Sequence, residues 1–222
     1  MRRADHARRP DLRHELRLAR RGQAPVAGLD EVGRGALAGP LYAAAVILPL
    51  ERFDLARSLA EVRDSKTLTP RQRRTCAANI RLLALDWALG EATCEEVDGL
   101  GPLAATRLAM RRALDRLALR PHHLLIDHLR LPDLPCEQTP LTHGDARVLS
   151  IAAASVLAKV ARDQEMEGLS QTYPTYGFSR HKGYGTAAHL RALRRWGPCP
   201  IHRRSFEPVA ALVSATPARR AC

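Results

Sequence analysis

Two adjacent acids, Asp30 and Glu31, close a short apolar run and carry carboxylates that could bind a metal ion. Gly33-Arg34-Gly35 follows at once, within the stretch VAGLDEVGRGALAGP. Neighbouring side chains on a strand point to opposite faces, so a strand cannot easily direct both carboxylates at one point. We therefore expect Asp30 to point into a shared metal centre and Glu31, where the strand ends, to reach it from the flank. Arg34 and the loop amides would then face a polyanion.

Two more acids occupy comparable positions. Asp127 ends the run LLID, and Asp145 closes THGD just before a helix rich in small residues. A buried acid at a strand end costs free energy unless it is paired or bound to a metal. Carboxylate oxygens suit Mg²⁺ or Mn²⁺, and two such ions about 3.5–4 Å apart stabilise both the attacking and the leaving oxygen of a phosphodiester displacement. The four acids are therefore candidates for a two-metal hydrolysis site.

Other interpretations of the polar residues remain open at this point. Acids at strand ends are often plain turn residues or helix caps, and no spacing rule selects this set of four. Cys199 and His202 have a C-x₂-H spacing that, together with His181 and His189, could suggest zinc. The latter two histidines are eight residues apart, which does not match one helix face, so we do not favour a zinc site.

Several charged residues in the C-terminal half also have two possible roles. Asp163 lies in the middle of an expected helix, and we expect it to be a structural ion-pair partner rather than a fifth metal ligand. Lys159, Arg203 and Arg204 could contact phosphate or could simply be solvated.

The elements that must position these side chains follow from the apolar pattern and the caps. Thr69 before Pro70 is a good helix start, and the small residues of SIAAASVLAKVARD let a long helix approach a sheet closely. Early strands mixed with helices indicate an α/β fold with one sheet. The predicted strands are 26–31, 41–49, 85–94 and 122–129, the predicted helices are 70–84, 102–119, 149–171 and 187–196, and a turn at 97–102 and a Pro-rich loop at 130–145 complete the prediction.

Length and charge limit the class of protein. The 222 residues suit one domain, and an apolar fraction of 45% is enough for a core. The net charge of +12 favours a polyanionic partner, with nucleic acid first and an acidic membrane surface second. Because 32 of the 35 basic residues are Arg, codon composition could contribute to this charge.

The remaining composition indicates a cytoplasmic protein with short appendages. The five cysteines form no close pairs, which argues against a disulfide framework. No apolar run approaches the ~18 residues that span a bilayer, so no membrane association is expected. Residues 1–22 lack the apolar centre of a secretory signal, and we expect a flexible basic arm there. The main domain should cover 23–209, followed by a frayed tail at 210–222.

Six ordered blocks of the sequence together resemble the ribonuclease HII family. They run from Val26 to Val209 and read GLDEVGRGALAGP, DSKTLTPRQR, HLLIDHL, HGDARVLSIAAASVLAKVARDQEM, YPTYGFSRHKGYGTAAHLRAL and GPCPIHRRSFEPV. No single block would suffice, but six in order over most of the chain make a specific match. The related ribonuclease HIII has an extra N-terminal domain, and the ~25 residues before Val26 are too few for one, so the resemblance favours HII.

The resemblance implies a ribonuclease H-like fold, a mixed sheet flanked by helices with a helical C-terminal part. It implies an endonuclease that hydrolyses the RNA strand of RNA–DNA hybrids and cuts 5′ of single ribonucleotides embedded in duplex DNA. Two divalent ions, Mg²⁺ or Mn²⁺, would give 5′-phosphate and 3′-hydroxyl ends. The implied role is ribonucleotide removal during DNA replication and repair, by a monomer. A hybrid-binding protein without catalysis is the second hypothesis, although clustered acids beside phosphates would only weaken a mere binder.

The same resemblance assigns roles to individual residues. The family's metal-binding acids match the four carboxylates already described. The other matches are the loop that inspects the 2′-hydroxyl, a block near the substrate backbone and a tyrosine that packs at the junction sugar. The assigned residues are Asp30, Glu31, Asp127 and Asp145 for metal, Gly33, Arg34 and Gly35 for the loop, Asp64, Ser65 and Lys66 for the block, and Tyr184 for the junction.

Three positions depart from the family pattern. His128 follows the third acid where the family usually has Gly, and His tolerates a positive φ less well. His143 replaces a usual Lys before the fourth acid, which exchanges a fixed charge for a titratable one. Ala36 stands where proline is common. None of these changes removes a metal ligand, so we expect them to affect the rate and pH profile rather than the chemistry.

Overall fold

A five-stranded mixed sheet forms the centre of the computed structural model, which describes residues 9–215. The strand order is β3-β2-β1-β4-β5; β1 is antiparallel to β2 and parallel to β4, β2 is antiparallel to β3, and β4 is parallel to β5. This arrangement confirms the α/β class with one mixed sheet flanked by helices. The strands are β1 (Val26–Val32), β2 (Leu41–Ile47), β3 (Asp86–Ala92), β4 (His123–Asp127) and β5 (Glu137–Leu141).

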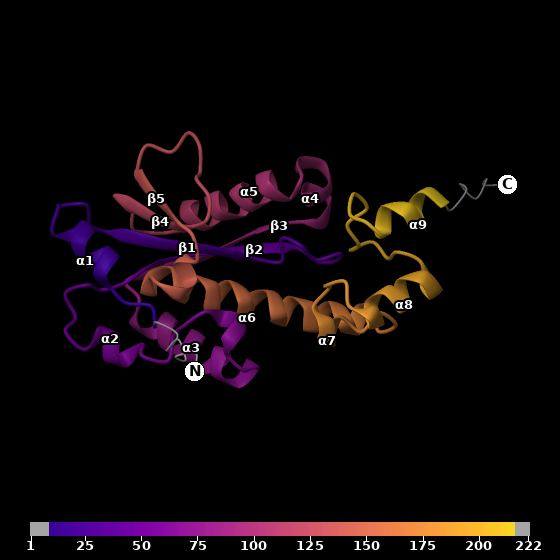
Figure 1. Cartoon of the computed structure of the whole chain (residues 1–222), viewed down its shortest axis with the longest axis horizontal. Coiled ribbons are helices and arrows are strands. Elements are labelled where there is room, and N and C mark those ends of the chain that lie inside the picture. Colours follow the sequence, from indigo (N-terminus) through magenta and orange to yellow (C-terminus); the bar gives the residue numbers. More distant parts are fainter. Residues whose placement is uncertain (1–8, 216–222) are drawn as a thin grey trace, which may run out of the picture.

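Helices cover both faces of this sheet (Figure 1). One face packs on α6 (Leu149–Thr172), which is itself backed by α3 (Pro70–Leu83). The other face packs on α5 (Pro102–Asp115). Two separate apolar clusters result, one on each side of the sheet. The remaining helical segments are α1 (Arg13–Ala19), α2 (Leu55–Ser58), η1 (Ser65–Thr67), α4 (Cys94–Leu100), η2 (Gly144–Ala146), α7 (Phe178–His181), α8 (Ala187–Trp196) and α9 (Val209–Ala215).

The long helix α6 approaches β1 as closely as its small residues predicted. A Cβ added to Gly28 would lie 2.2 Å from the carbonyl carbon of Ser150, so any larger residue in that part of β1 would force strand and helix apart. The 24 residues of α6 then continue past the sheet to the C-terminal helices α7, α8 and α9 (Figure 1). A single rigid element therefore connects the sheet with the C-terminal part.

The start of the described chain packs against the domain, which differs from the expectation of a flexible arm through residue 22. Leu18 on α1 is buried in an apolar cluster with Val26 and Ile151. The buried carboxylate of Glu15 accepts a hydrogen bond of 2.9 Å from the amide of Ser150 at the beginning of α6. An acid at a helix N-terminus satisfies a free amide and complements the helix dipole. Residues 1–8 lie outside the described part.

Three local predictions were wrong. The loop expected at 130–145 contains β5, where Pro140 is tolerated because this strand lies at the sheet edge. The turn expected at 97–102 contains most of α4, whose start at Thr93 has a capping box with Glu96. The frayed tail expected from 210 is helical through α9, and its residues 216–222 lie outside the described part.

Within residues 9–215, we find no helix with the length and apolarity needed to cross a membrane.

Candidate active site

The parallel pairing of β1 with β4 brings two of the predicted acids together. Leu29 pairs with Ile126 in the register, so Asp30 and Asp127 are the next residues on neighbouring strands. Asp145 reaches the same place from η2, because the amide of Gly144 donates a hydrogen bond of 2.7 Å to Oδ1 of Asp127. Three acids from distant parts of the sequence therefore meet at the carboxyl ends of two central strands.

Glu31 lies beside them with Arg34. Its Oε1 is 3.1 Å from Nη2 of Arg34, and its side chain is only 9% exposed, whereas that of Arg34 is 42% exposed. Burial, opposed by the Arg34 charge and reinforced by Asp127, raises the pKa of Glu31. The charge of Asp127 acts on Glu31, so the second acid of the adjacent pair lies within electrostatic reach of the other acids.

Burial and mutual repulsion act on the other acids as well. Burial, followed by the charges of Glu31 and Asp127, raises the pKa of Asp30 well above its usual range. Burial, followed by Asp64 and Asp127, raises the pKa of Asp145. A carboxylate favours its protonated form in such surroundings, and a nearby cation would reverse that preference. The carboxylates of the cluster therefore repel one another unless a positive charge lies nearby.

Lys66 supplies part of that charge from η1. Its Nζ is 3.7 Å from Oδ2 of Asp145, while the Asp64 side chain accepts a hydrogen bond from the Lys66 amide and fixes the turn. Although partial burial acts to lower it, the pKa of Lys66 is raised because several carboxylates favour the ammonium. Those carboxylates are Asp145, Asp64, Asp30 and Asp127.

Two serines connect this turn with the most buried acid. The hydroxyl groups of Ser65 and Ser155 are 3.0 Å apart and buried, and the Ser155 hydroxyl lies near enough to Asp30 to act to lower its pKa. The Glu31 amide also donates to Oδ1 of Asp30, at 2.7 Å. The Glu31 amide therefore fixes one oxygen of Asp30, and Ser155 lies beside the same carboxylate. Sequence reasoning missed Ser155, since a serine within a small-residue helix looks like a packing residue.

The donor set fits divalent cations with a preference for oxygen. Four carboxylates share one neighbourhood, and the raised pKa values of three of them show that a cation would relieve their repulsion. In the described part of the chain, however, no three His, Cys, Asp or Glu side chains already surround one point as a metal requires. The acids therefore form an electrostatic cluster, and no metal geometry is set up in advance among the described residues.

A buried arginine joins the predicted recognition loop to the predicted junction tyrosine. Arg162 on α6 is fully buried, and its guanidinium donates to the carbonyls of Ala38, Pro40 and Lys182 at 2.8–3.1 Å. Its Cζ lies 5.4 Å from the ring centre of Tyr184. Gly33 has φ +92°, and a Cβ there would be 2.2 Å from Nε of Arg162. Only glycine therefore fits at position 33, where the loop passes over this guanidinium.

A second buried arginine holds the same loop from the other side. Arg203 is fully buried and donates to the carbonyl of Arg34 at 2.9 Å and twice to that of Gly39, at 2.8 and 3.1 Å. Burial, with the nearby charge of Arg162, lowers the pKa of Arg203 to about 10. The alternatives of a phosphate contact or a solvated side chain are both wrong for Arg203, because its donors are directed into the protein.

A chain of hydrogen bonds fixes the backbone of Tyr184. The Cys199 amide donates to Nδ1 of His202 at 2.9 Å, which leaves the proton of this imidazole on Nε2. That nitrogen faces Nε2 of His189 at 3.0 Å, and Nδ1 of His189 donates to the Tyr184 carbonyl at 3.0 Å. Three of the four residues considered for zinc, Cys199, His202 and His189, therefore form a hydrogen-bonded support for the tyrosine.

The prediction for Asp163 is confirmed. Its carboxylate lies 2.6 Å from Nζ of Lys159 and 3.6 Å from Nη2 of Arg73, so it is an ion-pair partner in the structure. Arg162, by contrast, was missed. A signal existed in the adjacent Arg162-Asp163 pair after the small-residue turns, but one arginine among 32 does not reveal its burial.

Comparison with known proteins gives one consistent family. The family model described as Ribonuclease HII matches residues 27–209. A ribonuclease HII of Moorella thermoacetica is 53% identical over 193 residues, which cover 87% of this chain and 91% of that protein. One of Syntrophotalea carbinolica is 52% identical over 195 residues, covering 88% and 91%. The crystal structure of the ribonuclease H2 from Pyrococcus horikoshii OT3 is similar with a TM-score of 0.69 and 26% identity, over 85% of this chain and 97% of that one.

These matches extend over the whole site. The matched residues include the acids, the loop at 33–40 and the turn around Tyr184, and the similar structure confirms the ribonuclease H-like fold. An enzyme is thereby confirmed over a binding protein without catalysis. This chain belongs to the ribonuclease HII family, and it is a ribonuclease H, an endoribonuclease that acts on RNA–DNA hybrids.

Proposed function

We propose that this enzyme cuts the RNA strand of hybrids and also cuts 5′ of a single ribonucleotide in duplex DNA, leaving 5′-phosphate and 3′-hydroxyl ends. The observation that carries the proposal is the meeting of Asp30, Glu31, Asp127 and Asp145 at the ends of β1 and β4. The proposed cellular role is the removal of ribonucleotides from DNA by a monomeric enzyme.

The same four acids are the proposed ligands of two Mg²⁺ or Mn²⁺ ions. Bound there, the ions would supply activation of a water molecule and charge stabilisation at the leaving 3′-oxygen. Asp30 is well prepared for this role, because the Glu31 amide already orients its carboxylate. A hydrogen-bonded ligand keeps its orientation when the metal leaves, which favours binding.

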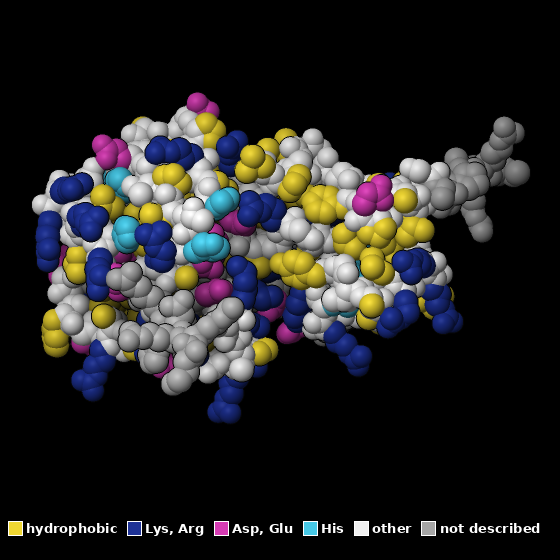
Figure 2. All heavy atoms as spheres, in the orientation of Figure 1, with side chains coloured by type: hydrophobic (Ala, Val, Ile, Leu, Met, Phe, Trp, Pro, Cys, Tyr) yellow, Lys and Arg dark blue, Asp and Glu magenta, His cyan; other side chains and the backbone are white. Residues whose placement is uncertain are grey.

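Nearby cations attract and orient the substrate backbone in this proposal. The side chain of Lys66 is 81% exposed although its ammonium lies beside Asp145, so it can exchange this contact for a substrate phosphate. The Asp64 and Ser65 side chains hold the turn that presents it. Arg34 lies partly exposed beside Glu31. Figure 2 shows Lys and Arg side chains over much of one face, consistent with a polyanionic substrate.

The loop and the tyrosine are the proposed readers of the sugar. RNA differs from DNA by a 2′-hydroxyl that both donates and accepts hydrogen bonds. Gly33, Arg34 and Gly35 present backbone groups without side chains at the two glycines, and space is open beside Gly35. The half-buried ring of Tyr184 would pack on the following deoxyribose, where a 2′-hydroxyl would clash. Because Arg162 contacts both segments, loop and ring have a fixed relation.

Cleavage at a junction compared with cleavage inside a continuous hybrid tests this function. The wild-type enzyme with Mg²⁺ or Mn²⁺ should cut a labelled DNA duplex with one ribonucleotide, and the products should carry the stated ends. Tyr184→Ala should slow junction cleavage by at least tenfold more than hybrid cleavage, and Tyr184→Phe, which keeps the ring, should lose less. Equal slowing on both substrates, or loss of the folded state, would contradict the junction role of Tyr184. No cut at the single ribonucleotide by the wild type would contradict the wider proposal.

A further inference from the structure

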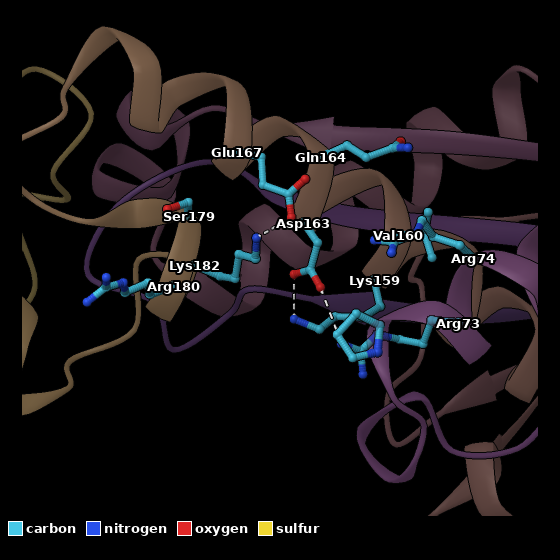
Figure 3. A pocket seen from close by; sticks show the side chains of 11 residues that line it. Arg73, Arg74, Lys159, Val160, Asp163, Gln164, Glu167, Ser179, Arg180 and Lys182 are labelled. Atoms are coloured by element: carbon cyan, nitrogen blue, oxygen red, sulfur yellow. Dashed lines mark hydrogen bonds and ion pairs between the residues drawn. The ribbon is translucent and has the colours of Figure 1, made fainter.

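A basic hollow lies beside the active site, between α3, α6 and α7 (Figure 3). Its volume is about 340 Å³. Five cationic and two anionic side chains line it, which gives a net charge of +3. The cations are Arg73, Arg74, Lys159, Arg180 and Lys182.

The two anions are neutralised by the hollow's own cations. Asp163 is paired with Lys159 and Arg73, and Glu167 lies 2.6 Å from Nζ of Lys182. Arg74 and Arg180 differ from these three cations. Both are exposed, and among residues 9–215 neither has a carboxylate within ion-pair distance.

The free guanidinium groups stand on opposite sides of the hollow, Arg74 on α3 and Arg180 on α7 (Figure 3). A guanidinium offers paired N–H donors in a fork that matches phosphate oxygens, and it keeps its charge at every physiological pH. The ion-paired residues between the two arginines provide an ordered floor with no unpaired carboxylate to repel an anion. We propose that this hollow binds a backbone phosphate of the nucleic acid, away from the one that is cut.

The position of the hollow relative to the acids supports this ligand. Arg73, in its wall, donates to the carbonyl of Ser65 at 2.8 Å, and the Ser65 hydroxyl lies 3.0 Å from that of Ser155, which lies beside Asp30. Along α6, Lys159 and Asp163 follow Ser155 by one and two turns, or about 6 and 12 Å. Phosphates of one strand repeat every ~3.4 Å of duplex axis, so the hollow is roughly two to four nucleotides from the acids.

This inference rests on the proposed substrate but can fail independently of it. The test measures affinity for an RNA–DNA hybrid without divalent ions, as a function of salt, for Arg74→Ala and Arg180→Ala. Arg120→Ala is the matched control, since Arg120 is exposed and precedes β4 at the strand end opposite the acids. Each test variant should bind about tenfold more weakly at low salt, with a slope of log K against log salt shallower by about 0.9. The melting temperature should match that of wild type, and kcat at saturating substrate should stay within twofold.

A scan with neutral linkages identifies the phosphate. One methylphosphonate is placed at a time along each strand of the hybrid, and its effect is measured with wild type and Arg180→Ala. At one linkage, two to four nucleotides from the cut, the neutral group should weaken wild-type binding to the level of Arg180→Ala. The same neutral group should not weaken binding by Arg180→Ala any further. Additive losses at every linkage, or losses in Arg120→Ala equal to those in the test variants, would overturn the phosphate site. Absence of hybrid cleavage by the wild type would instead contradict the proposed function.

Discussion

Replacing Asp145 tests its proposed role in cleavage separately from its role in folding. Its carboxyl is raised in pKa by burial and by Asp64 and Asp127, so it is held among like charges. Asp145→Asn keeps the shape and removes one charge. We expect cleavage with Mg²⁺ to fall by at least 100-fold, while the metal-free protein melts at the same or a higher temperature because repulsion is relieved. Single-turnover cleavage and thermal melting measure both effects.

The control for this variant is Asp115→Asn, at the exposed end of α5. It should change neither cleavage nor melting temperature. Near wild-type turnover of Asp145→Asn at ordinary Mg²⁺ concentration would mean that Asp145 is no metal ligand and that the metal site has other members.

His128 allows a test of backbone strain next to Asp127. It has φ 62°, a left-handed conformation that costs a non-glycine residue about 1 kcal/mol, and its side chain is exposed. His128→Gly should therefore raise the free energy of unfolding by up to about 1 kcal/mol, which denaturant titration resolves. His128→Ala keeps the Cβ and should bring no such gain. A loss of stability in the glycine variant would show that the imidazole contributes more than the strain costs.

The paired histidines of the C-terminal part, His189 and His202, predict that the stability of the fold depends on pH. Burial, then the neighbouring His189, lowers the pKa of His202 to about 4. A histidine whose pKa is depressed by folding stabilises the fold fully above its unfolded pKa of about 6.5. This stability is lost as the pH falls from about 6.5 to 4, and by pH 5 the loss is on the order of 2 kcal/mol.

Urea titration at pH 7 and pH 5 measures that loss. Wild type should lose more stability on acidification than His202→Gln, which cannot take up the proton. The exposed His122 provides the control, and His122→Gln should follow the wild type at both pH values. The proposed pH dependence of the pair is wrong if His202→Gln shows the same pH dependence as wild type.

Elements with local sequence signals could be predicted, whereas contacts between distant parts of the chain could not. The strand ending at Asp127 and the helix after Asp145 could be predicted, because apolar runs and small residues are local signals. The burial of Arg162 could not, because its carbonyl partners at Ala38 and Pro40 are more than 120 residues away. The edge strand β5 was hidden for a related reason: it depends on pairing with β4, and its own proline indicates a loop.

The first helix supports the molecule from close to the candidate site, because the preceding Asp11 pairs with Val148, three residues after Asp145. Deleting residues 1–8 should leave both stability and turnover unchanged. Deleting residues 1–22 also removes the Glu15 bond to the Ser150 amide and the buried Leu18, and should lower the free energy of unfolding by about 3 kcal/mol. In both truncated chains, kcat at saturating substrate should remain within a few-fold of wild type at a temperature where they are folded.

Equilibrium unfolding of the two truncated chains, with kcat measured beside it, distinguishes a structural segment from a catalytic one. Glu15→Gln gives the intermediate case, since the amide oxygen can still accept from Ser150 but carries no charge. A collapse of kcat in a folded 1–22 deletion would place part of the arm in the catalytic machinery.

The uninterrupted course of α6 has a consequence for where the enzyme cuts. Ser155, which lies beside Asp30, and Arg162, which contacts the loop and Tyr184, lie seven residues apart on this one helix, about 10 Å along its axis. The helix therefore sets a fixed distance between the residues proposed to recognise the sugar and the acids proposed to hydrolyse the phosphate. If both parts work as proposed, the cut falls at a constant offset from the inspected sugar, and precision of one nucleotide needs no moving part.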